Sequence, residues 1–172
     1  MKALLGKFSI LHNIRKRNFA HNLTNSFVNK PRFFNMSLPF PVALRSFTHA
    51  SLWIAPNRIE PEITRLIQSL CSFINNSNPL LSFYDIGANI GWHAWNCLAY
   101  TKDVPIHIFE PDESNIILLK KTINQSNLKG ISVHSIALSD KDCEAYFQID
   151  SLTSATGTLE KGEKTWIEQY LG

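Results

Sequence analysis

The sequence predicts an α/β fold, a Rossmann-like, doubly wound and mostly parallel sheet that is incomplete after its third main strand. Three observations predict it. A short apolar run at 80–86 leads directly into a glycine turn, as expected of a strand buried on both faces. Apolar runs at 104–109 and 131–138 then alternate with stretches of helical periodicity. Glu110 ends the second run, where parallel sheets place ligand-binding acids.

The composition suits a single folded domain without a membrane span. The 172 residues are 44% hydrophobic and 18% charged, enough to bury roughly two-thirds of the unfolded surface. No apolar run approaches the ~18 residues of a spanning helix. Cys71, Cys97 and Cys143 form no CxxC pair, so we expect core thiols, no metal site and a reducing, cytoplasmic location.

Charge is divided unevenly along the chain. Nine Lys and Arg and no acid precede Glu60, whereas eight basic and 14 acidic residues stand from Glu60 onward. We interpret residues 1–57 as a basic, solvated arm and expect no nucleic-acid partner, although such an arm can touch phosphates. An organelle transit peptide is also compatible with the acid-poor pattern, whereas Lys7 argues against a secretory signal.

The arm and the first helix meet near Arg58. Four prolines between Pro31 and Pro56, and no glycine between Gly6 and Gly87, predict an extended arm without sharp turns. The compact part, 58–172, should open with a helix at 61–74, because Pro61 and its flanking acids suit a helix N-terminus. One apolar stripe should lie on the rest of the fold: Ile63, Leu66, Ile67, Leu70 and Ile74.

The later elements follow in order. We predict a helix at 91–101 and another that opens at 111–113 and is closed by 128–130. The second should have Ile116, Leu119 and Ile123 on its inner face. A half-exposed strand is expected at 145–149, and the signal fades beyond Asp150.

The segment from Asp85 to Gly91 carries the chemistry. Gly87 and Gly91 let a ligand approach the backbone, and Glu110 can accept both hydroxyls of a ribose. Asp85 could merely cap the next helix. As a ligand group, however, its carboxylate would repel a pyrophosphate and suits a cation such as S-adenosylmethionine.

The remaining candidates near the loop are aromatic or imidazole side chains. His93 and Trp92 could line the pocket, but we favour Trp92 and Trp95 as core residues. We interpret His107 as a strand histidine without a ligand role. His93 is the titratable side chain next to the glycine loop, and no catalytic base is assigned.

These motifs resemble the FkbM-type methyltransferases, whose sheet is of the class I methyltransferase type. The likeness spans about 61–159 and includes 84–92, 108–111, 137–140 and the small-residue loop 154–159. It implies transfer of a methyl group from S-adenosylmethionine to a hydroxyl of a sugar, glycan or small metabolite. It implies that the cofactor's methionine end is held by Asp85, Gly87, Ala88, Asn89 and Gly91. Glu110 would hold the ribose, and Ala137 and Leu138 would flank the adenine.

The resemblance ends early. Family members continue into another central strand with a Lys-Ile-Asp-Val-Glu-Gly type segment, and this chain stops at Gly172 without it. We therefore expect a truncated or split gene product whose first strand has a bare edge, open to self-association. The alternatives are a non-catalytic remnant that binds S-adenosylmethionine or a partner and, less favoured, half of an NAD-type oxidoreductase.

Overall fold

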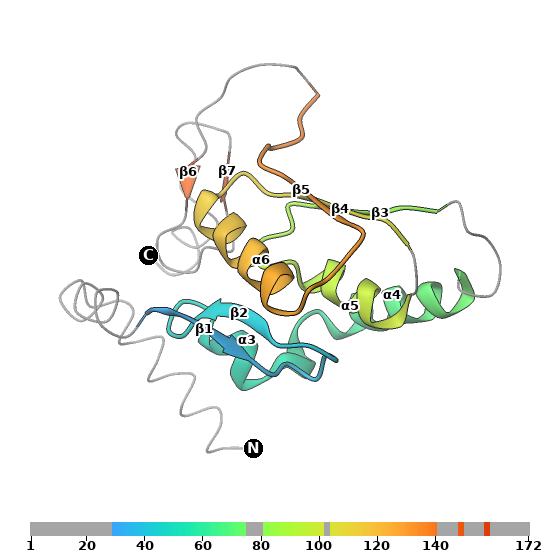
Figure 1. Cartoon of the computed structure of the whole chain (residues 1–172), viewed down its shortest axis with the longest axis horizontal. Coiled ribbons are helices and arrows are strands. Elements are labelled where there is room, and N and C mark those ends of the chain that lie inside the picture. Colours follow the sequence, from blue (N-terminus) through green and yellow to red (C-terminus); the bar gives the residue numbers. More distant parts are fainter. Residues whose placement is uncertain (1–28, 75–80, 102–103, 141–147, 150–156, 159–172) are drawn as a thin grey trace.

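A three-stranded parallel sheet forms one outer layer of the computed structural model, which describes residues 29–74, 81–101, 104–140, 148–149 and 157–158 (Figure 1). Its strands are β3 (Phe83–Ile86), β4 (Ile106–Phe109) and β5 (Ile131–His134), in that order across the sheet. Asp85 pairs with Ile108, which in turn pairs with Val133. The three predicted strands are confirmed, although each is shorter than its apolar run.

Two helices connect these strands on one side of the sheet (Figure 1). Helix α5 (Trp92–Tyr100) joins β3 to β4, and α6 (Glu113–Gln125) joins β4 to β5. Consecutive right-handed crossovers that advance in the same direction place both helices on the same face. Ile106 and Ile108 are fully buried in the core. The result is a mixed α/β structure compatible with a Rossmann-like fold.

The opposite face of the sheet is not covered by any described helix, so the expectation of strands buried on both faces was wrong. Tyr84 and Ile86 of β3 are 57% and 62% exposed. A row of stacked rings crosses this face from Tyr84 through His107 to His134, with Phe109 against His134. In a doubly wound sheet, strands that advance in the other direction bring the helices for this second face.

Residues 29–58 are folded, which corrects the expected extended arm over this range. Strands β1 (Pro31–Phe34) and β2 (Val42–Arg45) form an antiparallel hairpin, followed by α3 (Ala50–Ile54) and the 3₁₀ turn η1 (Pro56–Arg58). The connection contains no glycine, and Ser37 adopts the left-handed conformation instead, with φ of 59°. The absence of glycine therefore does not exclude a turn that reverses the chain direction.

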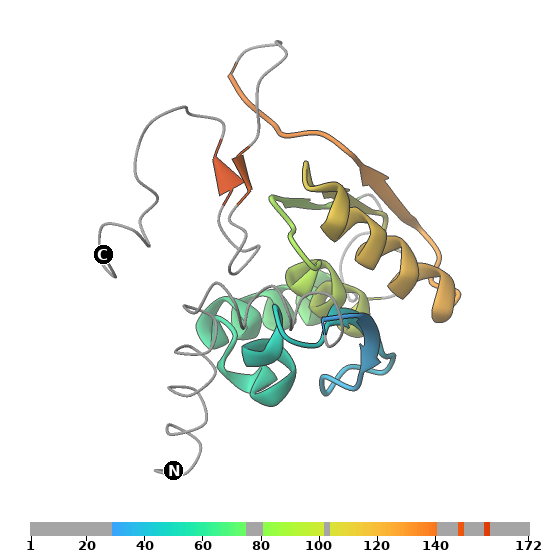
Figure 2. The same ribbon diagram turned by 90° about the vertical axis from the view of Figure 1, so that its left-hand side faces the viewer.

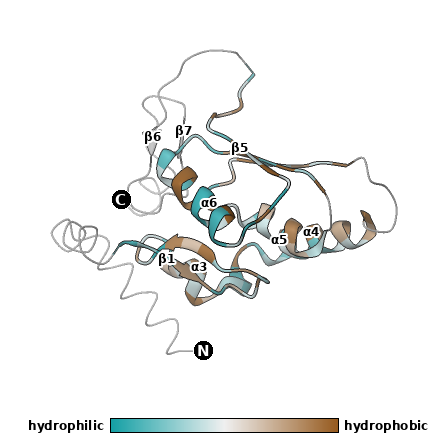
Figure 3. Ribbon diagram, viewed as in Figure 1, coloured by the Kyte–Doolittle hydropathy of each residue, from teal (hydrophilic) through white to brown (hydrophobic). Residues whose placement is uncertain are grey.

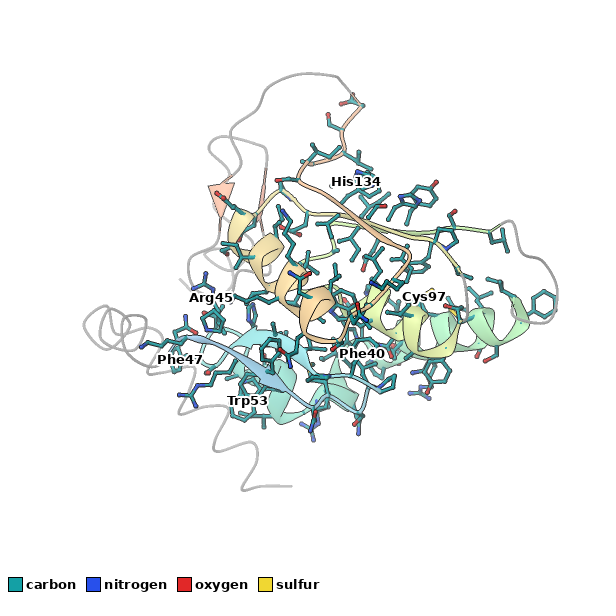
Figure 4. All side chains as sticks on the ribbon, viewed as in Figure 1. Phe40, Arg45, Phe47, Trp53, Cys97 and His134 are labelled. Atoms are coloured by element: carbon teal, nitrogen blue, oxygen red, sulfur yellow. The ribbon has the colours of Figure 1, made fainter. Side chains whose placement is uncertain are left out.

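This hairpin forms a third layer beneath the helices (Figures 1 and 2). The Ala43 amide donates to Thr122 Oγ1 of α6 at 2.9 Å. Phe40 meets Trp95 of α5 edge to face, with ring centroids 6.1 Å apart (Figure 4). Val42, Ala43 and Leu44 belong to the main hydrophobic cluster. The packed core therefore begins well before residue 58, while residues 1–28 of the predicted arm lie outside the described ranges.

Helix α4 (Pro61–Ile74) matches the predicted helix, but most of its apolar stripe is exposed. The side toward α5 instead carries Thr64, Gln68 and Cys71, which contact Trp92, Asn96 and Cys97 respectively. Four large apolar side chains are exposed: Ile63, Leu66, Leu70 and Phe73. Figure 3 shows hydrophobic residues along α4. The expectation that this stripe packs on the described fold was therefore wrong for its three exposed residues, whereas Ile67 packs on the core and Ile74 is half-buried.

Two short strands complete the described structure. β6 (Gln148–Ile149) pairs antiparallel with β7 (Gly157–Thr158). β6 lies within the predicted strand at 145–149, whose first three residues are outside the described ranges; β7 had no sequence signal. Among the described residues, no helix is long and apolar enough to cross a membrane.

Candidate functional site

The glycine loop connects β3 to α5 at the carboxyl edge of the parallel sheet. Its backbone amides are largely used within the chain. Gly87 N and Ala88 N both donate to Phe109 O, at 2.9 and 3.1 Å, and Gly91 N donates to Ala88 O at 2.7 Å. These hydrogen bonds hold the loop against the end of β4.

Glu110 fastens the same loop to the start of α6. Its Oε2 accepts from Asn89 N at 2.7 Å, and its Oε1 accepts from Asp112 N at 2.9 Å. The Asn115 side-chain amide lies 3.5 Å from Oε1. The carboxylate is buried, so these donors compensate for the water it has lost. The structure thus brings Asn89 and Glu110 together, and Glu110 has a loop-organising contact that the sequence did not indicate.

The two glycines of the loop serve different purposes. Gly87 has φ of 72°, is exposed, and would place an added Cβ in open space. Gly91 has φ of 80°, but a Cβ there would lie 2.7 Å from Trp95 Cε2 and 2.8 Å from Leu119 Cδ2. Gly87 is therefore compatible with a ligand approaching the backbone. Gly91 is required by helix packing, which corrects the idea that both glycines expose backbone.

Asp85 lies at the end of β3 with its carboxylate directed at the first turn of α5. Oδ2 accepts from Ala94 N at 2.9 Å, so Asp85 does cap the helix. The residue is only 6% exposed, and this burial raises the pKa of its carboxyl above the ordinary value. The Ala94 amide and His93 act to lower that pKa, whereas Glu110 and Glu60 raise it further.

Glu60 is a site residue that sequence reasoning missed. It precedes α4, and its Oε2 lies 2.8 Å from Nε2 of His93 in the first turn of α5. The acids around Pro61 were interpreted only as partners of the helix dipole. Because the contact depends on how α4 packs against α5, no local sequence signal could have found it.

Ala137 and Leu138, which were expected beside an adenine, lie in the segment that follows β5. Glu110 N donates to His134 O at 3.1 Å, so the ends of β4 and β5 are adjacent. Ala137, three residues beyond β5, is half-buried, and Leu138 is exposed. The topology brings both to the same sheet edge as Gly87 and Glu110.

The interpretation of several aromatic and thiol residues as structural is confirmed. Trp92 and Trp95 are buried, with Trp95 Nε1 donating to Ile90 O at 2.6 Å. Cys71 and Cys97 are buried free thiols whose sulfurs lie 3.5 Å apart (Figure 4), whereas Cys143 lies outside the described ranges. Within the described part of the chain, no three His, Cys, Asp or Glu side chains gather as metal ligands would.

Comparison with models of known families and with curated proteins found no match to the chain.

Proposed function

We propose that this chain is the cofactor-binding part of an S-adenosylmethionine-dependent methyltransferase of the FkbM type, with a class I methyltransferase sheet. The acceptor would be a hydroxyl of a sugar, glycan or small metabolite. One observation carries the proposal: the buried Asp85 carboxylate lies beside the glycine loop, within electrostatic reach of two further carboxylates, Glu60 and Glu110.

An acidic site of this kind favours a cationic ligand. Neighbouring carboxylates repel one another when they are ionised, and a bound cation reduces that repulsion. S-adenosylmethionine has an ammonium and a sulfonium and no phosphate. The residues present fit this cofactor: the Asp85 carboxylate would attract its charged end, and Gly87 leaves space beside the backbone.

The hydrogen bonding of the loop argues against the dinucleotide alternative. A pyrophosphate needs free backbone amides at the loop and helix start. Here the amides of Gly87, Ala88, Asn89 and Gly91 donate to acceptors within the chain. Ala94 N donates to Asp85, whose negative charge would also oppose a phosphate.

The chain's own residues would bind the cofactor and orient it. Glu110 would keep the loop in place and offer its remaining acceptor capacity to the ribose, and Ala137 and Leu138 would contact the adenine. When bound, S-adenosylmethionine would supply a methyl group that an acceptor oxygen can attack, with S-adenosylhomocysteine as the leaving group. Holding the acceptor in line is worth as much as ~7–11 kcal/mol in well-oriented systems.

Calorimetric titration with S-adenosylhomocysteine and with NAD tests the proposal. We expect heat of binding with S-adenosylhomocysteine and none with NAD. The reverse result would remove the methyltransferase assignment and support the oxidoreductase half.

Substitution of Glu110 tests the ribose assignment. Glu110→Ala should weaken S-adenosylhomocysteine binding by ~1–3 kcal/mol, because charge-assisted hydrogen bonds are lost. Glu113→Ala, at the exposed first position of α6, is the matched control. Urea unfolding of both variants separates a folding defect from a binding defect, since Glu110 also bonds two backbone amides. An unchanged dissociation constant would place the ribose elsewhere.

The edge of β3 supports a second candidate, a cofactor-binding remnant that pairs with another chain or with itself. The amides of Phe83 and Gly87 point toward β4, so those of Tyr84 and Ile86 point to an edge without a described strand. No Lys, Arg or Pro protects β3. Sedimentation equilibrium should show self-association that Ile86→Lys abolishes. A monomeric wild-type protein would exclude the pairing of the chain with itself.

A cytoplasmic location remains part of the proposal. Cys71 and Cys97 are free thiols with adjacent sulfurs, a state that a reducing compartment preserves.

A further inference from the structure

Glu60 and His93 form a contact at the rim of the glycine loop. The Glu60 carboxylate oxygen Oε2 lies 2.8 Å from His93 Nε2, with side chains 58% and 27% exposed. His93 directly precedes Ala94, whose amide binds Asp85. The pair therefore combines an anionic group and an imidazole beside the buried carboxylate.

The backbone holds Glu60 in an unusual conformation. Its φ is 37°, in the left-handed region that non-glycine residues rarely adopt, and such strain clusters at functional sites. Its carbonyl accepts from Thr64 N at 2.9 Å. Thr64 Oγ1 in turn accepts from Trp92 Nε1 at 3.1 Å. Docking of α4 on α5 thus sets the position of Glu60 beside the first turn of α5.

The pair acts on the site electrostatically. His93 lowers the pKa of the Asp85 carboxyl and Glu60 raises it, which places both within electrostatic reach of that carboxyl. His93 Nδ1 is buried and has no hydrogen-bond partner in the described part of the chain. The imidazole is therefore held at one nitrogen only.

We infer that Glu60 and His93 recognise the amino-acid end of the cofactor, Glu60 its ammonium and His93 its carboxylate. This inference rests on the proposed function and assigns residues outside the glycine loop to ligand selectivity. An α-amino acid group has one charge of each sign, and this pair offers an acceptor and an N–H donor side by side.

A purely structural role explains less. Ion pairs between exposed side chains contribute little to stability. The Glu60–His93 contact therefore does not compensate for the strain of Glu60 at positive φ by stabilising the docking of α4. Thr64 and Gln68 already join α4 to α5 by neutral hydrogen bonds. Recognition of a charged ligand accounts for both the strain and the location.

Two adenosyl ligands test the inference. S-adenosylhomocysteine has the amino-acid end, and 5′-methylthioadenosine has the same adenosine and thioether without it. By calorimetry, Glu60→Gln should weaken the binding of S-adenosylhomocysteine on the order of tenfold, as loss of one charge-assisted hydrogen bond does. Binding of 5′-methylthioadenosine should stay within about twofold, because it never reaches the pair.

Matched variants complete the experiment. Glu62 is an exposed acid in the first turn of α4, and Glu62→Gln should leave the affinity for both ligands unchanged. His93→Gln should show the same preference as Glu60→Gln, and it keeps the test available should Glu60→Gln unfold. Equal losses for both ligands, or no loss for either, would overturn the inference while leaving the proposed function intact. Wild-type protein that binds neither ligand would remove the proposed function, and the inference with it.

Discussion

Gly87 and Gly91 stand four residues apart with almost the same φ, yet they should respond differently to substitution. Gly91→Ala forces a Cβ into Trp95 and Leu119, which adds overpacking to the backbone strain. We expect a loss of ~2–5 kcal/mol in the free energy of unfolding. Gly87→Ala meets no atom and should cost only ~1–2 kcal/mol, the strain alone.

Urea denaturation of the two alanine variants measures this difference directly. Equal losses would mean that Trp95 and Leu119 relax freely around the new methyl group. If both variants fold, Gly87→Ala should weaken ligand binding more than Gly91→Ala does. The open space beside Gly87 is where the proposed ligand would approach the backbone.

The buried carboxyl of Asp85 makes stability depend on pH. Its pKa is raised in the folded protein above the ordinary value of 3.8, so the native state binds the proton more tightly than the unfolded state. Stability from this group is present below pH 3.8 and is lost as pH rises through the native pKa. Asp85→Asn removes that loss while its side-chain oxygen can still accept from Ala94 N.

We therefore expect Asp85→Asn to gain stability relative to wild type as pH rises from 3 to 7. Urea unfolding at several pH values measures the trend, and Asp140→Asn, at an exposed position, is the control. A difference that is independent of pH would contradict the raised pKa. The same variant should bind S-adenosylhomocysteine more weakly, since the carboxylate is lost.

At the scale of elements, packing of α4 on α5 buries two thiols. Burial raises the pKa of Cys97 to about 12 and also raises that of Cys71. Thiolate is the reactive form, so neither thiol should react with a disulfide reagent at pH 8 in the native state.

Labelling in a Cys143→Ser background checks this expectation, because position 143 lies outside the described ranges. Two thiols should react in urea and none without it. Rapid native labelling of Cys71 or Cys97 would show that α4 separates readily from α5.

Elements whose signals are local could be predicted from the sequence, and those that depend on packing could not. Asp112 caps α6 and Ile116 and Leu119 are buried, as proline, acid and periodicity indicated. The glycine loop and Glu110 were also found, because a strand, a turn and a second strand lie close in sequence. The Glu60–His93 contact and the exposure of Leu66 and Leu70 follow from where α4 docks, which periodicity does not determine.

At the scale of the whole molecule, the hairpin upstream of Arg58 joins the core without any sequence signal that we recognised. The basic charge and the prolines of this segment indicated an extended arm, and the apolar run that forms β2 is too short to indicate a strand by itself. Val42 and Leu44 are fully buried, and Ala43 is bonded to α6. A sheet, a helix layer and a hairpin therefore form one continuous hydrophobic cluster.

If this cluster is one cooperative unit, a cavity in the hairpin must destabilise the distant sheet. Leu44→Ala should reduce the free energy of unfolding by ~2–5 kcal/mol, as for other fully buried leucines. Amide hydrogen exchange in β4 should accelerate by the factor that this loss predicts, because those amides open only with the global transition. Phe33→Ala, at an exposed position on the adjacent β1, should leave β4 exchange nearly unchanged. Unaltered protection of β4 in Leu44→Ala would instead make the hairpin a separate unit that merely rests on α5 and α6.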